Sequence, residues 1–171
     1  MAKMQPWYTN TVFVILSDHC ASSSGKTELP LDKYHIPAMI YAPGFISPRN
    51  ENKLMSQIDV MPTLFGLLNF KYQSKFFGQD VLKPNYKPRA FIATYEDLGF
   101  IKNDILTIIS PVKKQKQFDL KMNKNSKIAA DFQIYYEETP RKALDSTLIL
   151  EATSFYQTAT YMLQNKKYQK L

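Results

Sequence analysis

Short apolar runs separated by polar loops dominate the first part of the chain. Residues 11–16, TVFVIL, are β-branched and apolar, and the pattern predicts a buried central strand. A long polar loop at 21–34 follows. A second apolar run at 38–42 begins after Pro37 and ends at the turn pair Pro43 and Gly44. Proline is tolerated where a strand begins, so this run predicts another strand.

The next apolar pattern predicts a helix. In the segment 56–70, SQIDVMPTLFGLLNF, Ser56 and Asp59 have the spacing of a capping box, although Asp59 could instead be the N-cap residue itself. Pro62 would then lie in the first turn, where its missing N–H costs little. Asp59 is therefore interpreted as a capping residue and not as a catalytic one. The apolar side of the helix is formed by Leu64, Phe65, Leu67 and Leu68.

Beyond residue 89 the pattern changes to short strands. Apolar and β-branched runs at 90–95, 105–110, 115–120 and 132–136 predict an antiparallel meander, connected by EDLGF, KND and a lysine-rich loop. The last element is a predicted helix, because apolar residues recur every three or four positions. They are Leu144, Leu148, Ala152, Phe155, Ala159 and Met162.

A Pro- and Lys-rich stretch, KPNYKPR, separates the two patterns. It predicts two domains, 1–85 with an α/β core and 86–171 with a small antiparallel sheet and a closing helix.

Composition limits the function classes. The single cysteine, Cys20, excludes an intrachain disulfide, and no apolar run reaches the roughly 18 residues of a membrane span. The net charge is +7, with much of the excess in the lysine-rich segment 113–127 and near the C-terminus. Such runs are typical of a solvated lysine face. A polyanion-binding surface is the alternative, but no nucleic-acid motif accompanies the charge.

Candidate chemistry begins where the first predicted strand ends. Asp18 and His19 follow it directly, and ligand sites in open α/β sheets lie at the carboxyl ends of strands. A carboxylate oxygen and an imidazole nitrogen suit Zn²⁺ or Mn²⁺. Two ligands are too few for a complete catalytic site, which needs at least three from protein. On the pattern alone, a structural role in loop capping stays open.

Longer segments carry a resemblance. NTVFVILSDHCASSSGKTELPLDKYHIPAMIYAPG, SQIDVMPTLFGLLN and FFGQDVL, across residues 10–82, resemble the second half of a sulfatase-type phosphotransferase domain. The nearest family is that of lipoteichoic acid synthase-like proteins in the alkaline phosphatase superfamily. The resemblance implies the C-terminal part of an alkaline-phosphatase-like α/β/α sandwich, followed by a small antiparallel sheet with a closing C-terminal helix.

The resemblance also implies site residues. Asp18 and His19 match the metal-binding pair, for one divalent ion, Mn²⁺ or Zn²⁺, or Ca²⁺ in a sulfatase. Lys26 and His35 match positions near the anionic substrate group less closely, and a surface lysine and a packing histidine are the alternatives. Cys20 is interpreted as a small packing residue.

The implied function is that of a metal-dependent enzyme acting on phosphodiester or sulfate esters. The closest match is a phosphoglycerol or phosphoethanolamine transferase of the cell envelope, with an inner-membrane parent and a lipid-linked substrate. The family's nucleophilic threonine and an acidic metal ligand lie in a first half that this sequence does not match. We therefore expect a soluble chain that is inactive alone, with an exposed sheet edge that favours self-association. An arylsulfatase and a non-catalytic polyanion-binding module are the alternatives.

Overall fold

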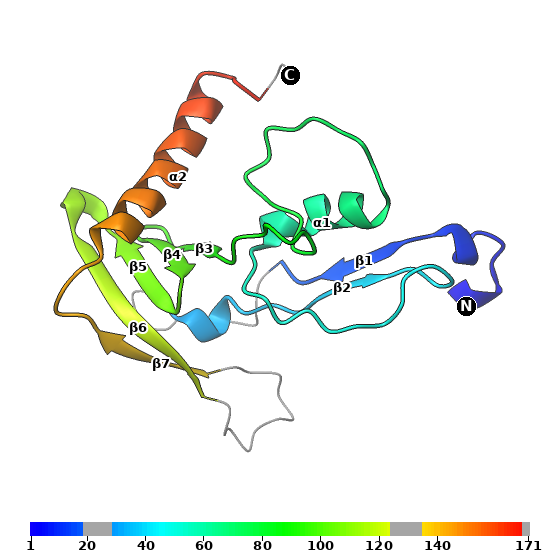
Figure 1. Ribbon diagram of the computed structural model, residues 1–171, viewed down its shortest axis with the longest axis horizontal. Helices are drawn as coiled ribbons and strands as arrows, with labels where there is room; N and C mark the ends of the chain where they lie inside the picture. Colours follow the sequence, from blue (N-terminus) through cyan, green and yellow to red (C-terminus); the bar gives the residue numbers. More distant parts are fainter. Residues whose placement is uncertain (19–28, 124–134, 169–171) are drawn as a thin grey trace.

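The computed structural model describes residues 1–18, 29–123 and 135–168, and in this part of the chain two antiparallel sheets and two α-helices form (Figure 1). The strands are β1 (Phe13–Leu16), β2 (Ala38–Tyr41), β3 (Ala90–Ala93), β4 (Leu98–Lys102), β5 (Ile105–Ile109), β6 (Gln115–Asn123) and β7 (Tyr135–Pro140). The α-helices are α1 (Val60–Leu67) and α2 (Ser146–Gln164). Short 3₁₀ helices span Ala2–Met4, Tyr8–Asn10, Leu31–Lys33, Gln57–Asp59 and Pro111–Lys113.

The larger sheet is a meander. Its strand order is β3-β4-β5-β6-β7, and each pair of neighbours is antiparallel. The mixed α/β fold class with a C-terminal antiparallel sheet and closing helix is thereby confirmed. Strand β4 was not predicted, because its residues were assigned to connections. Asn103 and Asp104 form the tight turn into β5 with φ of 53° and 56°, a conformation that Asn and Asp tolerate better than most residues.

Both faces of the meander are covered, and the alternation of strand residues decides which residue faces which cover. Leu106 and Ile108 of β5 pack with Leu29 and Leu31, which lie in and beside the 3₁₀ helix Leu31–Lys33. On the opposite face, α2 contributes a second cluster. That cluster contains Phe100, Leu148 and Ala152, each with at most 4% of its surface exposed, together with the rings of Phe91 and Phe155.

Helix α2 begins at a well-formed cap. The Asp145 carboxylate accepts hydrogen bonds from the backbone N–H groups of Thr147 and Leu148, at 2.9 and 3.1 Å. The predicted apolar face is present from Leu148 onward. Leu144, the first apolar position of the predicted helix, lies before α2 and is exposed. The helix begins two residues later, at Ser146.

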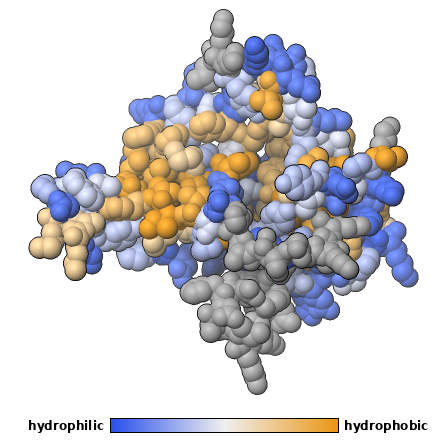
Figure 2. Space-filling model, turned by 180° about the vertical axis from the view of Figure 1, so that it is seen from behind, coloured by the Kyte–Doolittle hydropathy of each residue, from blue (hydrophilic) through white to orange (hydrophobic). Residues whose placement is uncertain are grey.

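The smaller sheet is an exposed two-stranded ribbon. β1 pairs only with β2 among the described residues, from Phe13 opposite Tyr41 to Leu16 opposite Ala38. Ile15 and Met39 have 55% and 52% of their surface exposed, and Figure 2 shows hydrophobic side chains on the ribbon side of the molecule. The prediction of a buried central strand at 11–16 is therefore wrong for this structure, because no other described strand or helix layer covers the ribbon.

The lysine-rich segment is not simply a loop. Residues Gln115–Asn123 form β6, a strand three residues longer than predicted, and the lysines at 116 and 121 belong to it. Strand β7 continues past the predicted end at residue 136 to Pro140. The rest of the predicted loop, 124–127, and the start of the last predicted strand, 132–134, lie outside the described residues.

No helix in the described ranges is both long enough and apolar enough to cross a membrane.

Candidate functional site

The end of β1 brings the described candidate residues to one end of the ribbon. Asp18 follows β1 by two positions and is exposed. The β1–β2 register, continued past Leu16 opposite Ala38, sets Asp18 opposite Ile36, the residue after His35. The antiparallel pairing therefore places Asp18 and His35 at the same end of the ribbon, although 17 positions separate them in the sequence.

This end of the ribbon is also tied to the first turn of the helical segment. The Gln57 side chain donates a hydrogen bond from Nε2 to the Ser17 carbonyl oxygen, at 3.3 Å. Gln57 begins the 3₁₀ helix that runs into α1. The backbone just before Asp18 is thus held by two elements, β2 and the start of the helix. No sequence pattern predicted the contact from Gln57.

His35 has a pKa below its ordinary value. Desolvation disfavours the imidazolium even though the side chain retains surface exposure. The imidazole is therefore neutral at physiological pH, the form that can accept a hydrogen bond or ligate a metal.

His19, Lys26 and Cys20 lie outside the described residues. In the part of the chain that is described, no three or more His, Cys, Asp or Glu side chains gather as a metal site would require. Asp18 is thus the one proposed ligand with a described position, and His19 stays a prediction.

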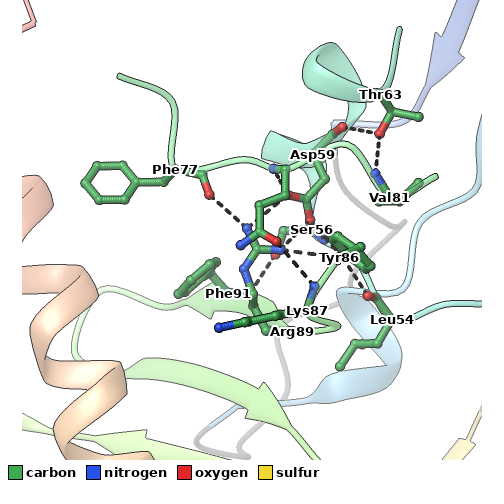
Figure 3. A network of polar contacts seen from close by, with 11 residues as sticks. Leu54, Ser56, Asp59, Thr63, Phe77, Val81, Tyr86, Lys87, Arg89 and Phe91 are labelled. Atoms are coloured by element: carbon green, nitrogen blue, oxygen red, sulfur yellow. Dashed lines mark hydrogen bonds and ion pairs between the residues drawn. The ribbon is translucent and has the colours of Figure 1, made fainter. Parts of the chain in front are cut away.

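A buried cluster of polar side chains lies elsewhere, around Asp59 (Figure 3). Asp59 and Arg89 are 0% and 1% exposed, and the guanidinium contacts the carboxylate through two hydrogen bonds of 2.9 and 3.0 Å. The Ser56 N–H donates to Asp59 Oδ2 at 2.9 Å, the reciprocal contact of a capping box, and the Gln79 N–H donates to Oδ1 at 2.7 Å. The predicted capping role of Asp59 is confirmed, but it is only part of what this carboxylate does.

Further contacts enclose the pair. Arg89 Nη2 also donates to the Phe77 carbonyl oxygen at 2.8 Å. The hydroxyl of Tyr86 lies 2.8 Å from the Leu54 carbonyl and 3.2 Å from Asp59, and burial and the Asp59 charge raise the pKa of Tyr86. The hydroxyl therefore stays protonated and donates to one of these oxygens at a time.

Steric fit closes the cluster. At Gly78, a Cβ atom would lie 1.9 Å from the Ile58 carbonyl oxygen, so only glycine lets the chain pass this close to the helix start. A buried, fully enclosed ion pair of this kind offers no space for a substrate. We interpret the cluster around Asp59 as the structural joint between α1 and β3, the strand that Arg89 precedes.

Arg89 was missed by the sequence analysis. It belongs to KPNYKPR, the stretch assigned to a domain boundary. A weak signal existed, because an arginine directly before an apolar strand can be buried together with that strand, and a buried arginine needs a carboxylate partner. Its Tyr86 and Arg89 are buried and hydrogen-bonded to Leu54 and Asp59 of the first segment.

Comparison with known proteins agrees with the resemblance. Residues 2–70 match the sulfatase family model. The whole fold is similar to the crystal structure of a protein in the alkaline phosphatase superfamily from Vibrio parahaemolyticus, with a TM-score of 0.81 and 26% sequence identity. That match covers 98% of this chain and 38% of the Vibrio chain.

The two findings support a C-terminal sulfatase-type domain of the alkaline phosphatase superfamily, as the sequence motifs predicted. Sulfatase-type enzymes act on ester substrates and generally use a divalent metal. This chain spans less than half the length of the solved structure that it matches.

Proposed function

We propose that this chain forms part of the active site of a metal-dependent enzyme that acts on phosphodiester or sulfate esters. The observation that carries the proposal is the position of Asp18. It follows a strand that lies within the region matched by the sulfatase family model, and it is exposed at a ribbon end shared with His35. A carboxylate with these surroundings is accessible to an ion and to a substrate.

The donor atoms fit a divalent metal in kind but not in number. Asp18 would supply a carboxylate oxygen and His19 an imidazole nitrogen, a set that suits Mn²⁺ or Zn²⁺, whereas Ca²⁺ prefers oxygen ligands alone. A bound ion would supply Lewis-acid stabilisation of charge on the ester oxygens. The chain's own part would be to orient that ion through Asp18 and to hold the backbone before it through Gln57.

The ligand set is completed, in this proposal, by residues that have no counterpart in this chain. The support is coverage, since more than half of the Vibrio chain lies outside the match. We further propose that a region equivalent to the unmatched part of the Vibrio chain supplies a nucleophilic threonine and an acidic metal ligand. These residues would make the enzyme a phosphoglycerol or phosphoethanolamine transferase of the cell envelope. An arylsulfatase would instead require a cysteine or serine nucleophile there.

The first experiment is to read the coding sequence in frame upstream of Met1 and to express the product that it encodes. We expect turnover of bis-p-nitrophenyl phosphate by that product, and a loss of at least about 100-fold in Asp18→Asn, because removing one metal ligand's charge weakens both binding and Lewis-acid chemistry. Faster turnover of p-nitrophenyl sulfate would favour the arylsulfatase alternative.

A matched control uses a carboxylate far from the ribbon. Asp104 lies in the β4–β5 turn with φ of 56°, which asparagine also tolerates, so Asp104→Asn should leave turnover unchanged. Metal content measured in the same preparations separates loss of the ion from loss of folding. Full turnover and full metal content in Asp18→Asn would refute the proposal.

The isolated chain of 171 residues is expected to bind Mn²⁺ or Zn²⁺ weakly and to show no turnover. Calorimetry that found tight one-to-one binding would mean that this chain holds a complete site by itself. The non-catalytic alternative predicts salt-sensitive retention on heparin, lost when the lysines of 113–127 are neutralised.

A further inference from the structure

An exposed group of aromatic rings follows α1. Phe70, Tyr72 and Phe76 are 57%, 44% and 54% exposed. They surround the ring of Phe65, with centroid distances to it of 5.5, 5.0 and 6.4 Å. Burial of apolar area is the usual reason for such rings to gather, yet three of the four keep about half of their surface in solvent. The group is ordered by its own contacts and is not covered by another described element.

Lysines surround these rings. Lys71 and Lys75 alternate with them in the loop, and the Lys75 ammonium donates a hydrogen bond to the Lys167 carbonyl oxygen at 2.6 Å. That contact brings the loop against the end of α2, and in Figure 1 both lie at the same end of the molecule. The last turn of α2 and the chain after it add further exposed lysines and apolar side chains. They are Leu163, Lys166, Lys167 and Tyr168.

The charge of this surface has one sign. Neither segment that forms it, 65–77 nor 152–168, contains an Asp or Glu, while the two together contain four lysines. We call this surface the aromatic–basic patch, defined by Phe70, Lys71, Tyr72, Lys75, Phe76, Leu163, Lys166, Lys167 and Tyr168. The charge of +4 that these two segments carry beside exposed rings complements a partner that is both anionic and apolar.

We propose that the aromatic–basic patch binds the surface of an anionic lipid bilayer. Aromatic side chains favour the interface between headgroups and acyl chains, and lysines beside them are attracted to anionic headgroups. The rings contact one another, with Phe65 stacked on Phe70 and edge-on to Tyr72, instead of standing apart as platforms for successive bases. This arrangement favours lipid over single-stranded nucleic acid. The patch is separate from Asp18, so this inference does not depend on the proposed enzyme activity.

The test is co-sedimentation of the 171-residue chain with vesicles. We expect binding to vesicles of phosphatidylglycerol and phosphatidylcholine, little binding to phosphatidylcholine alone, and weaker binding as salt is raised. Two double variants test the patch: Phe70→Ser with Phe76→Ser, and Lys71→Gln with Lys75→Gln. Each should lower the partition coefficient by about tenfold, because lysines and rings that enter the membrane interface each contribute to binding.

Matched controls lie elsewhere on the surface. Tyr95 is fully exposed between β3 and β4, and Lys142 is exposed between β7 and α2, so Tyr95→Ser and Lys142→Gln should change partitioning less than twofold. Circular dichroism checks that every variant is folded.

Three outcomes would overturn the proposal. The first is no binding to anionic vesicles, and the second is binding that the patch variants leave unchanged. The third is that the aromatic substitutions alter the oligomeric state or the binding of a single-stranded oligonucleotide while lipid binding persists. That result would assign the rings to a protein or nucleic-acid interface.

Discussion

The two sheets of this chain differ in how they dispose of their apolar residues. The five-stranded meander lies between α2 on one face and the segment around Leu29 and Leu31 on the other, and Phe100 and Leu106 are wholly buried. The β1–β2 ribbon has the same kind of apolar sequence, yet Ile15 and Met39 are more than half exposed. An apolar strand is therefore buried only when another layer is present to cover it, and the ribbon carries the candidate metal residue while the meander supplies stability.

The largest effect is expected at the joint between α1 and β3, which Asp59 and Arg89 form. Arg89→Met removes the partner of a buried carboxylate, and leaving Asp59 charged and unpaired should cost about 3–5 kcal/mol in the free energy of unfolding. Urea denaturation measures the loss. The matched control is Lys102→Met, which breaks the less buried contact to Glu151 at 2.6 Å and should cost about 1 kcal/mol or less.

A double variant sharpens this result. If the penalty comes from the isolated charge, Asp59→Asn combined with Arg89→Met should be more stable than the sum of the single variants predicts. Equal losses of unfolding free energy in Arg89→Met and Lys102→Met would contradict the interpretation of the Asp59–Arg89 pair as a structural joint.

The next largest effect is expected from truncating a buried apolar residue, compared with an exposed one. Leu106→Ala empties a site in the meander core and should cost about 2–5 kcal/mol. Ile15→Ala in the ribbon should cost less than about 1 kcal/mol, because most of that side chain already contacts water. The pair is measured by the same urea denaturation, and a large loss in Ile15→Ala would show that something covers the ribbon in solution.

High pH should destabilise the meander through Tyr156. Burial raises the pKa of Tyr156 to about 12, and its hydroxyl lies 2.8 Å from the Gly99 carbonyl oxygen. Because the folded pKa exceeds the unfolded value near 10, this stability is full below pH 10 and is lost as the pH rises toward 12, by on the order of 2 kcal/mol. Tyr156→Phe should flatten the decline of unfolding free energy between pH 10 and 12. An unchanged slope would mean that another tyrosine is responsible.

The smallest effect on stability is expected from charging the ribbon surface, which tests its exposed edge. Ile15→Lys should leave the unfolding free energy within about 0.5 kcal/mol, as for most surface substitutions, and should reduce self-association through the edge. Light scattering across a concentration series measures the association. A clean monomer before the substitution would remove the expectation that the ribbon pairs with a second copy.

Local patterns predicted much of the fold. The Ser56–Asp59 capping spacing, the apolar face of α2 and four of the five meander strands followed from side-chain type and period, which act over a few residues. β4 escaped because LGFIK is short and contains Gly99, so it was assigned to a connection. Burial of the ribbon could not be predicted correctly, because exposure depends on which layers are present and not on the strand's own sequence.

The candidate site was predicted less completely. Asp18 was recognised from its place after a strand, and its position at one ribbon end with His35 follows from a register that the sequence alone did not give. Arg89 and Gln57 act through contacts to residues 30 and 40 positions away. Such pairings depend on the tertiary arrangement, so no local sequence pattern predicts them.

The order of the meander has a consequence for how this chain acquires its structure. Each strand from β3 to β7 pairs with its immediate neighbour in sequence, so these contacts close short loops and cost little chain entropy to form. Pairing of β1 with β2 instead closes a connection of 21 residues, and few buried contacts offset the entropy cost of that closure. The meander with α2 should therefore form early during folding, and the ribbon, with Asp18 at its end, should take shape last.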